Sequence, residues 1–183
     1  YPTGVIMPIN RRRELISWCY EKSDRYIIED DYDSEFRFVG KPIPAMQGLD
    51  PSKIIYMGTF SKAIAPAIRV AYMVLPEKLM EEYESKLKFL LCTVPRSNQN
   101  ILETFIKEGY FERHLNRMRT NYRLKRDALI ESIRNNLSEA KVFENNSGLH
   151  ILLTLDHFSE GEIINLRKSC RNQTLSYICF LYR

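Results

Sequence analysis

The sequence contains few glycines and prolines, 7 and 8 among its 183 residues. Low-complexity and collagen-like chains need far more of both, so these classes are excluded. Aromatic residues make up 11% of the chain and hydrophobic residues 44%, which is unlike an intrinsically disordered chain. The composition therefore predicts a globular protein, either one large domain or one domain with part of another.

Cysteine is also scarce, and its spacing excludes the usual cysteine-built sites. The four cysteines form no Cys-x-x-Cys pair and no cluster with histidine; they are Cys19, Cys92, Cys170 and Cys179. We therefore expect neither a metal site nor a disulfide framework. Free thiols in a reducing cytoplasm are the expected state.

Long apolar runs and an excess of one charge are absent as well. No apolar run is long enough to cross a bilayer, and no charged-then-apolar leader opens the chain. Lys and Arg number 27 against 23 Asp and Glu, and the two signs are mixed along the chain, which is weak support for a nucleic-acid surface. Residues 117–126 are locally basic, but their spacing is typical of the solvent face of a helix. We expect a cytoplasmic protein that makes no membrane contact.

The first half of the chain has the pattern of an α/β domain. Helical spacing over residues 9–23 precedes a short apolar run, Tyr26–Ile28, that changes abruptly to acidic residues. This change is typical of a buried strand with charged groups at its carboxyl end. Two further strands are predicted at Ile54–Met57 and Val70–Val74, followed by a helix over residues 77–91 and a break over 93–99. Ligands of open α/β sheets bind beyond the carboxyl ends of the strands, so we expect the site there.

The second half predicts a long helix followed by a small α+β unit. Helical character is nearly continuous over residues 100–137, with a weak point at Gly109. Strands are predicted at Lys141–Phe143 and Leu149–Leu155, and a short helix at Ser159–Lys168 with Ser159 as its cap.

Three polar features follow the predicted strands. Asp30 ends the first strand, and Tyr32 comes two residues later. Lys62 lies in a Gly-Thr-Phe-Ser-Lys loop after the second strand, and Arg69 follows that lysine by seven residues. Taken singly each signal is weak, because a Ser-Lys pair is usually a surface lysine and an acidic run is usually a solvated turn. Their combination in this order is much more specific.

Chemistry gives a reason for each of these residue types. A lysine amine forms a Schiff base with an aldehyde cofactor, provided that its surroundings let it lose a proton. The hydroxyls of Thr59 and Ser61 and the guanidinium of Arg69 are suited to holding a phosphate group. A buried Asp keeps a pyridine nitrogen protonated, which makes the ring an electron sink. These residues fit pyridoxal 5'-phosphate.

Four stretches resemble the aminotransferase-like domain of MocR/GabR-type transcriptional regulators: YPTGVIMPINRRREL, YIIEDDYDSEFRF, GKPIPAMQGLD and IIYMGTFSKAIAPAIRVAYMVLP. Those regulators join an N-terminal winged helix–turn–helix of the GntR type to a fold-type-I (class I/II) aminotransferase domain that binds pyridoxal phosphate. The resemblance is nearly continuous from residue 1 to about residue 155. It implies an α/β fold in which residues 1–115 come from the large, cofactor-binding domain. Residues 116–183 would form the interdomain helix and part of the small α+β domain.

The resemblance also implies a role for each site residue. Lys62 would be the catalytic residue and would form the Schiff base. Asp30 would pair with the pyridinium nitrogen, and Tyr32 would approach the phenolic oxygen of the cofactor. Three further residues would lie near the phosphate or the Schiff-base lysine: Thr59, Ser61 and Arg69.

Partners follow from the same resemblance. The parent protein would be a homodimer that senses an amino-acid-like small molecule and contacts DNA only through a winged-helix domain outside this sequence. The first part of the large domain is outside it too, and residues 168–183 do not resemble the continuation of the family. The opening Tyr-Pro-Thr-Gly turn without an initiating Met also predicts part of a longer protein.

Three functions remain open from the sequence. The first function is the sensor domain of a regulator. The sequences of residues 29–37 and 58–70 favour it. The second is a transaminase that moves an amino group between an amino acid and a 2-oxo acid. The third is a truncated remnant without function, which the missing segments of the family pattern support.

Overall fold

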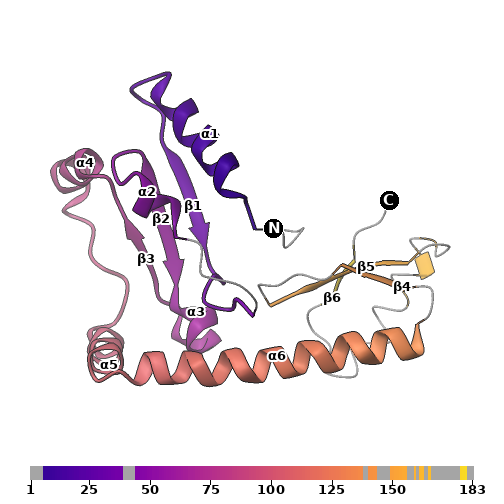
Figure 1. Ribbon diagram of the computed structural model, residues 1–183. Helices are drawn as coiled ribbons and strands as arrows, with labels where there is room; N and C mark the ends of the chain where they lie inside the picture. Colours follow the sequence, from indigo (N-terminus) through magenta and orange to yellow (C-terminus); the bar gives the residue numbers. More distant parts are fainter. Residues whose placement is uncertain are drawn as a thin grey trace. The chain divides into compact units, whose positions relative to one another are not determined.

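The structure is a computed structural model that describes residues 6–38, 44–137, 140–143, 149–155, 159, 161, 162, 165 and 178–180. Its helices and strands, labelled as in Figure 1, are α1 (Ile9–Tyr20), β1 (Ile27–Asp31), α2 (Met46–Leu49), β2 (Ile54–Thr59), α3 (Phe60–Ala63), the 3-10 helix η1 (Pro66–Ile68), β3 (Ala71–Val74), α4 (Glu77–Leu87), α5 (Arg96–Lys107), α6 (Tyr110–Asn136), β4 (Ala140–Phe143), β5 (Ile151–Leu155) and β6 (Ile178–Phe180).

The chain divides into two compact units, which are described separately. The sheet unit comprises Met7–Glu35 and Lys41–Arg117, and the tail unit comprises Tyr1–Ile6, Phe36–Gly40 and Met118–Arg183. In the sheet unit, β2 lies between β1, to which it is parallel, and β3, to which it is antiparallel. The predicted α/β class and the three predicted strands are confirmed, although β1 continues through the acidic residues to Asp31 and β2 continues to Thr59.

The two faces of this sheet have different surroundings. On one face, the Glu29 carboxylate accepts hydrogen bonds from the backbone amides of Met46 (2.9 Å) and Gln47 (3.1 Å) at the start of α2. Arg12 of α1 lies 3.6 Å from the same carboxylate, so α1 and α2 share this face, and Figure 1 shows both beside the sheet. Acidic groups are favoured at the first amides of a helix, which explains the choice of Glu29.

The opposite face is open within the described residues. Ile54, which shares the first face with Glu29, is 0% exposed, whereas Ile28 on the opposite face is 63% exposed. Met73 of β3 is exposed on that opposite face as well. The expectation that the first strand is buried is therefore wrong for this face, on which Ile28 and Asp30 are both exposed.

The helices that follow differ from prediction at their ends. The helix predicted over 77–91 ends at Leu87, and the next apolar residues, Phe89, Leu90 and Leu91, are exposed outside it. Helix α5 begins at Arg96, inside the predicted break. The weak point at Gly109 is confirmed: its φ of 72° is left-handed, a conformation that glycine adopts at low cost, and it separates α5 from α6.

The tail unit contains the later part of α6 and a second sheet. Strand β4 pairs antiparallel with β5, and β5 pairs parallel with β6. The strands predicted at 141–143 and 149–155 are confirmed, with β5 beginning at Ile151. The Ser159 hydroxyl lies 3.4 Å from the backbone amide of Glu162, whose carboxylate accepts from Ser159 at 2.8 and 2.6 Å, a capping box. Most of the helix predicted over 159–168 lies outside the described residues.

Membrane-spanning helices are not found in the part of the chain that the structure describes, because none of its helices is both long and apolar enough.

Two isoleucines on neighbouring strands give a test of this arrangement. We predict that Ile54→Ala lowers the free energy of unfolding by about 2–5 kcal/mol, because it leaves a cavity in a fully buried position. The matched variant Ile28→Ala is expected to change it by less than about 1 kcal/mol. Urea unfolding of the purified chain, followed by circular dichroism, measures both values. Equal losses for the two variants would contradict the described difference between the two faces of the sheet.

Candidate functional site

The strand register brings the predicted site residues to one end of the sheet. Because β1 and β2 are parallel, Asp30, which pairs with Met57, and Thr59 both lie near the carboxyl ends of their strands. Thr59 pairs with Ala71 of the antiparallel β3, so Arg69, two residues before Ala71, belongs to this end too. The loop containing Lys62 leaves the sheet directly after Thr59.

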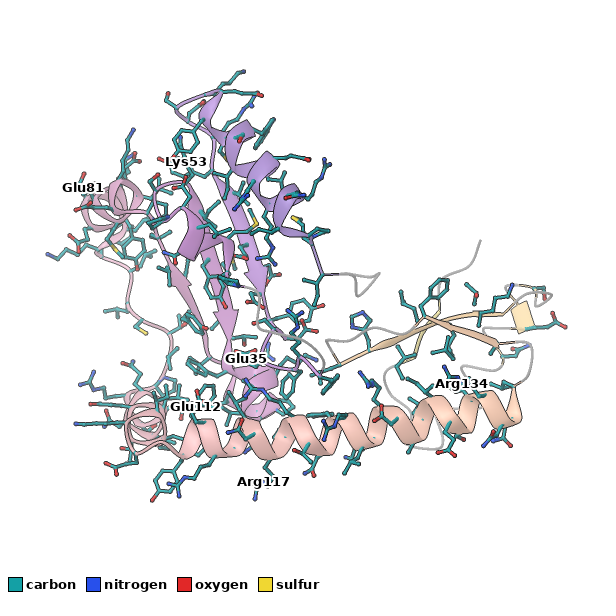
Figure 2. All side chains as sticks on the ribbon, viewed as in Figure 1. Glu35, Lys53, Glu81, Glu112, Arg117 and Arg134 are labelled. Carbon is teal, nitrogen blue, oxygen red and sulfur yellow. The ribbon has the colours of Figure 1, made fainter. Side chains whose placement is uncertain are left out.

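Figure 2 shows this polarity of the sheet unit. Glu35, which follows β1, is labelled near α3, while Lys53, which precedes β2, is labelled at the opposite end of the sheet. The predicted site residues therefore gather at the end marked by Glu35. This is the end at which ligands of open α/β sheets bind.

A short turn of backbone presents the lysine. The Thr59 hydroxyl accepts a hydrogen bond from the Ser61 amide (3.1 Å) and donates one to the Val70 carbonyl (3.1 Å). The Phe60 amide donates to the same carbonyl at 2.9 Å. Thr59 is therefore the N-cap of α3 and anchors its first turn to the residue before β3. In that turn Ser61 is buried and Lys62 is exposed.

Arg69 has an unusual backbone conformation. Its φ and ψ of 45° and 42° are left-handed, and it is the one non-glycine residue in the described part of the chain with a positive φ. This conformation costs a residue with a Cβ roughly 1–2 kcal/mol. Val70, the residue after Arg69, is held in place by the two hydrogen bonds that its carbonyl accepts. The surrounding turn therefore imposes the left-handed conformation on Arg69. Strain of this kind is concentrated at functional sites.

The two aspartates at the end of β1 face opposite sides of the sheet. Asp30 is exposed and shares the open face with Ile28. Asp31 is half-buried on the helix-covered face, where its Oδ2 accepts a hydrogen bond from the Tyr56 hydroxyl at 2.9 Å. Its Oδ1 accepts from the Ser34 amide at 3.2 Å, which closes the turn that contains Tyr32.

Aromatic side chains lie around Tyr56 on that face, and sequence reasoning did not predict them. The Tyr72 ring lies 6.1 Å from the Tyr56 ring and 5.2 Å from the Phe60 ring, measured between centroids. Tyr72 pairs with Gly58, and a Cβ on Gly58 would clash with the end of the Tyr72 ring. Glycine at this position therefore lets the Tyr72 ring lie across β2. In the sequence, the one available signal was a glycine two residues after Tyr56 on the same strand. Only the strand register shows that Gly58 makes room for the Tyr72 ring.

The surroundings of these phenols change their acidity. Burial, the hydrogen bond to Asp31 and the charge of its carboxylate raise the pKa of Tyr56 far above its ordinary value of 10.0. Burial also raises the pKa of Tyr72. Both hydroxyls therefore remain protonated, and Tyr56 remains a donor to Asp31, at physiological pH.

The exposed groups at this end of the sheet fit part of a pyridoxal-phosphate site. A primary amine, a carboxylate and a guanidinium are presented by Lys62, Asp30 and Arg69, and all three residues are exposed. These are the types of group needed by an aldehyde, a protonated ring nitrogen and a phosphate. The Thr59 hydroxyl donates its proton within the turn, so its described role is to hold the lysine loop.

The chain is similar to known transcriptional regulators and aminotransferases. No protein-family model matches the chain. The HTH-type transcriptional regulator YhdI of Bacillus subtilis is 46% identical over 157 residues, which are 85% of this chain and 33% of the regulator. The probable rhizopine catabolism regulatory protein MocR of Rhizobium meliloti is 36% identical over 166 residues, 90% of this chain and 34% of that protein. The multiple substrate aminotransferase of Thermococcus profundus superposes with a TM-score of 0.76 at 28% identity, covering 90% of this chain and 41% of that enzyme.

These similarities define the class of protein. The chain has the fold of part of a fold-type-I, pyridoxal-phosphate-dependent aminotransferase. More particularly, it is a partial aminotransferase-like domain of the kind found in MocR-type transcriptional regulators. The chain spans about a third of the length of the curated relatives it matches.

The strain at Arg69 gives a stability prediction. Arg69→Gly and Arg69→Ala both remove the guanidinium, but only glycine adopts the left-handed conformation without cost. We predict that the glycine variant has a free energy of unfolding about 1 kcal/mol higher than that of the alanine variant. Urea unfolding of both variants measures the difference. A less stable glycine variant would show that the turn does not impose this conformation.

The phenol bound to Asp31 gives a pH prediction. Since folding raises the pKa of Tyr56, the folded chain keeps a proton that the unfolded chain releases above about pH 10. The free energy of unfolding should therefore be unaffected by this group below about pH 10. Above it, the free energy should fall by up to about 1.4 kcal/mol per pH unit for one such group.

Urea unfolding between pH 8 and pH 11 checks this dependence. Tyr56→Phe should show a shallower fall than the unaltered chain, whereas Tyr83→Phe on α4 should show the same fall as the unaltered chain. Identical slopes for all three proteins would contradict the hydrogen bond described between Tyr56 and Asp31.

Proposed function

We propose that this chain is the part of a sensor domain that binds pyridoxal phosphate through Lys62 and responds to an amino compound. The observation that carries the proposal is the register of β1, β2 and β3, which brings Asp30, the Lys62 turn and Arg69 to one end of the sheet. The similarity to MocR and to a solved aminotransferase supports it independently.

Each site residue has a role that its chemistry supports. When bound, pyridoxal phosphate supplies an aldehyde that condenses with a primary amine, releasing water, and a pyridinium ring that withdraws electrons. Lys62 provides the amine, and Asp30 provides the carboxylate that keeps a proton on the ring nitrogen. The hydroxyl of Tyr32 would approach the phenolic oxygen of the cofactor.

Two further residues, Arg69 and Ser61, would bind the phosphate group of the cofactor. Arg69 provides a cation with two parallel donors, and its backbone lies two residues before the start of β3. Ser61 provides a hydroxyl one residue before the lysine, and Thr59 holds the turn that contains both. The strain at Arg69 is consistent with a residue placed for binding at some cost in stability.

The proposal extends to the parent protein. Residues 1–115 would belong to its large, cofactor-binding domain, and residues 116–183 to the interdomain helix and part of the small domain. A separate winged-helix domain would bind DNA, the site would be completed in a homodimer, and the protein would act in the cytoplasm. The MocR and YhdI relatives, both of them regulators by name, support this part of the proposal.

Two other functions have observations in their favour. The superposition on an aminotransferase over 90% of the chain is equally compatible with a transaminase, because such an enzyme uses the same amine, carboxylate and cation. The exposed apolar side chains of Ile28 and Met73 on one face of the sheet favour a remnant that no longer binds the cofactor.

Chemical trapping distinguishes a working site from a remnant. The full chain is mixed with pyridoxal phosphate, reduced with borohydride and digested, and the label is located by peptide mass spectrometry. We expect the label on Lys62, because it is the exposed amine next to Ser61 and near Asp30 and Arg69. Lys62→Ala should lose this label, while Asp30→Asn should reduce its yield.

Lys53 is the matched control for this experiment. It lies at the opposite end of the sheet in Figure 2, where its amine donates to the carbonyls of Ser23 (2.9 Å) and Arg25 (3.4 Å). Label spread over Lys53 and other lysines, or no label, would refute cofactor binding by this chain. If Lys62 alone is labelled, addition of single amino acids followed by detection of 2-oxo acids separates a transaminase from a sensor.

A further inference from the structure

Asp31 is next to the proposed cofactor residue Asp30 but lies on the other face of the sheet. Because side chains alternate along a strand, Asp31 cannot approach a ligand that Asp30 contacts on the open face. Its two oxygens are used within the protein: Oδ1 accepts from the Ser34 amide at 3.2 Å, and Oδ2 accepts from the Tyr56 hydroxyl at 2.9 Å. One carboxylate thus links the turn after β1 to the middle of β2.

The link continues to β3. The Tyr72 ring lies beside the Tyr56 ring, 6.1 Å away between centroids, and lies over Gly58. Tyr72 also packs against Phe60, the first residue of α3, at 5.2 Å between ring centroids. The carboxylate and two phenols therefore connect all three strands on the face behind the proposed site.

We propose that Asp31 and Tyr56 are positioning residues for the cofactor site: their hydrogen bond holds the Asp30 carboxylate and the Tyr32 turn in register with the turn that presents Lys62. This inference rests on the proposed function. It assigns no contact with the cofactor to either residue.

The geometry gives the reason. Asp30 and Tyr32 are the residues on either side of Asp31, so the rotation of the strand end that Asp31 fixes also fixes the directions of both. Tyr56 is three residues before Thr59, the cap of α3, on the strand that leads into the lysine turn. A binding site needs its groups held within about 0.5 Å, and hydrogen bonds from a supporting layer of residues provide that precision.

Four variants of the full chain test the inference. Tyr56→Phe removes the donor with little change of volume, and Asp31→Asn keeps an oxygen for the Ser34 amide while removing the carboxylate. The double variant shows whether the two residues act through one interaction. Tyr83→Phe on α4 is the control, since it removes a phenol hydroxyl elsewhere in the same unit.

Two measurements are made on each protein. The first is the apparent dissociation constant for pyridoxal phosphate, with the rate of borohydride labelling at Lys62. The second is hydrogen exchange of the chain without cofactor, read on the peptide that covers residues 27–36. We expect Tyr56→Phe and Asp31→Asn each to weaken binding by roughly tenfold, as loss of a supporting hydrogen bond does at other sites. The double variant should be no weaker than either single variant.

The exchange measurement separates positioning from general destabilisation. Both variants should exchange faster in residues 27–36, while peptides from α5 remain unchanged, and Tyr83→Phe should match the unaltered chain in both measurements. Additive effects, or loss of structure throughout both variants, would overturn the inference.

The outcomes for the unaltered chain keep the two proposals distinct. If the unaltered chain is labelled at Lys62 and Tyr56→Phe is labelled at the same rate, the positioning role is refuted and the proposed function stands. If the unaltered chain is not labelled at Lys62, the proposed function is refuted and the positioning role is refuted with it.

Discussion

The pairing of β2 with its two neighbours is the constraint on which the rest of the sheet unit depends. Parallel pairing with β1 fixes which residue lies beside Met57, and antiparallel pairing with β3 fixes which residue lies beside Thr59. Side chains alternate along a strand, so a slip of one residue would move every side chain of a strand to the other face. Asp30 would then lie under the helices, and Asp31 would lose its bond to Tyr56. The hydrogen bonds of Asp31 and the close fit of Tyr72 on Gly58 both oppose such a slip.

This alternation explains why two consecutive aspartates have unrelated tasks. Asp30 is exposed on the open face, where a ligand has access, and Asp31 is bonded to a phenol and a backbone amide on the covered face. The same division holds in the lysine turn, where Ser61 is buried and Lys62 is exposed. Short motifs on strands and tight turns therefore contain both exposed residues and residues that support the fold. Their order in the sequence does not show which is which until the faces are known.

Much of the fold could be predicted from the sequence because its signals are local. The apolar runs that begin at Ile54 and Val70 and the glycine between α5 and α6 act within a few residues, and the structure has the expected elements there. The Asp31–Tyr56–Tyr72 chain could not be predicted, because its members are 25 and 16 residues apart and meet only through strand pairing. The left-handed conformation of Arg69 was also hidden, since sequence rules assign it to glycine.

The open face of the sheet connects stability with the site. Asp30 shares this face with Ile28, which is 63% exposed, and with the exposed Met73 of β3, so the candidate site borders exposed apolar surface. The curated relatives are about three times as long as the matched segment, and any segment that covered this face would also approach the exposed side chain of Asp30. Anything that binds only the folded state stabilises it by mass action. Covering this face and binding a cofactor at its edge would each stabilise the same arrangement of β1 and β2, so each should strengthen the other.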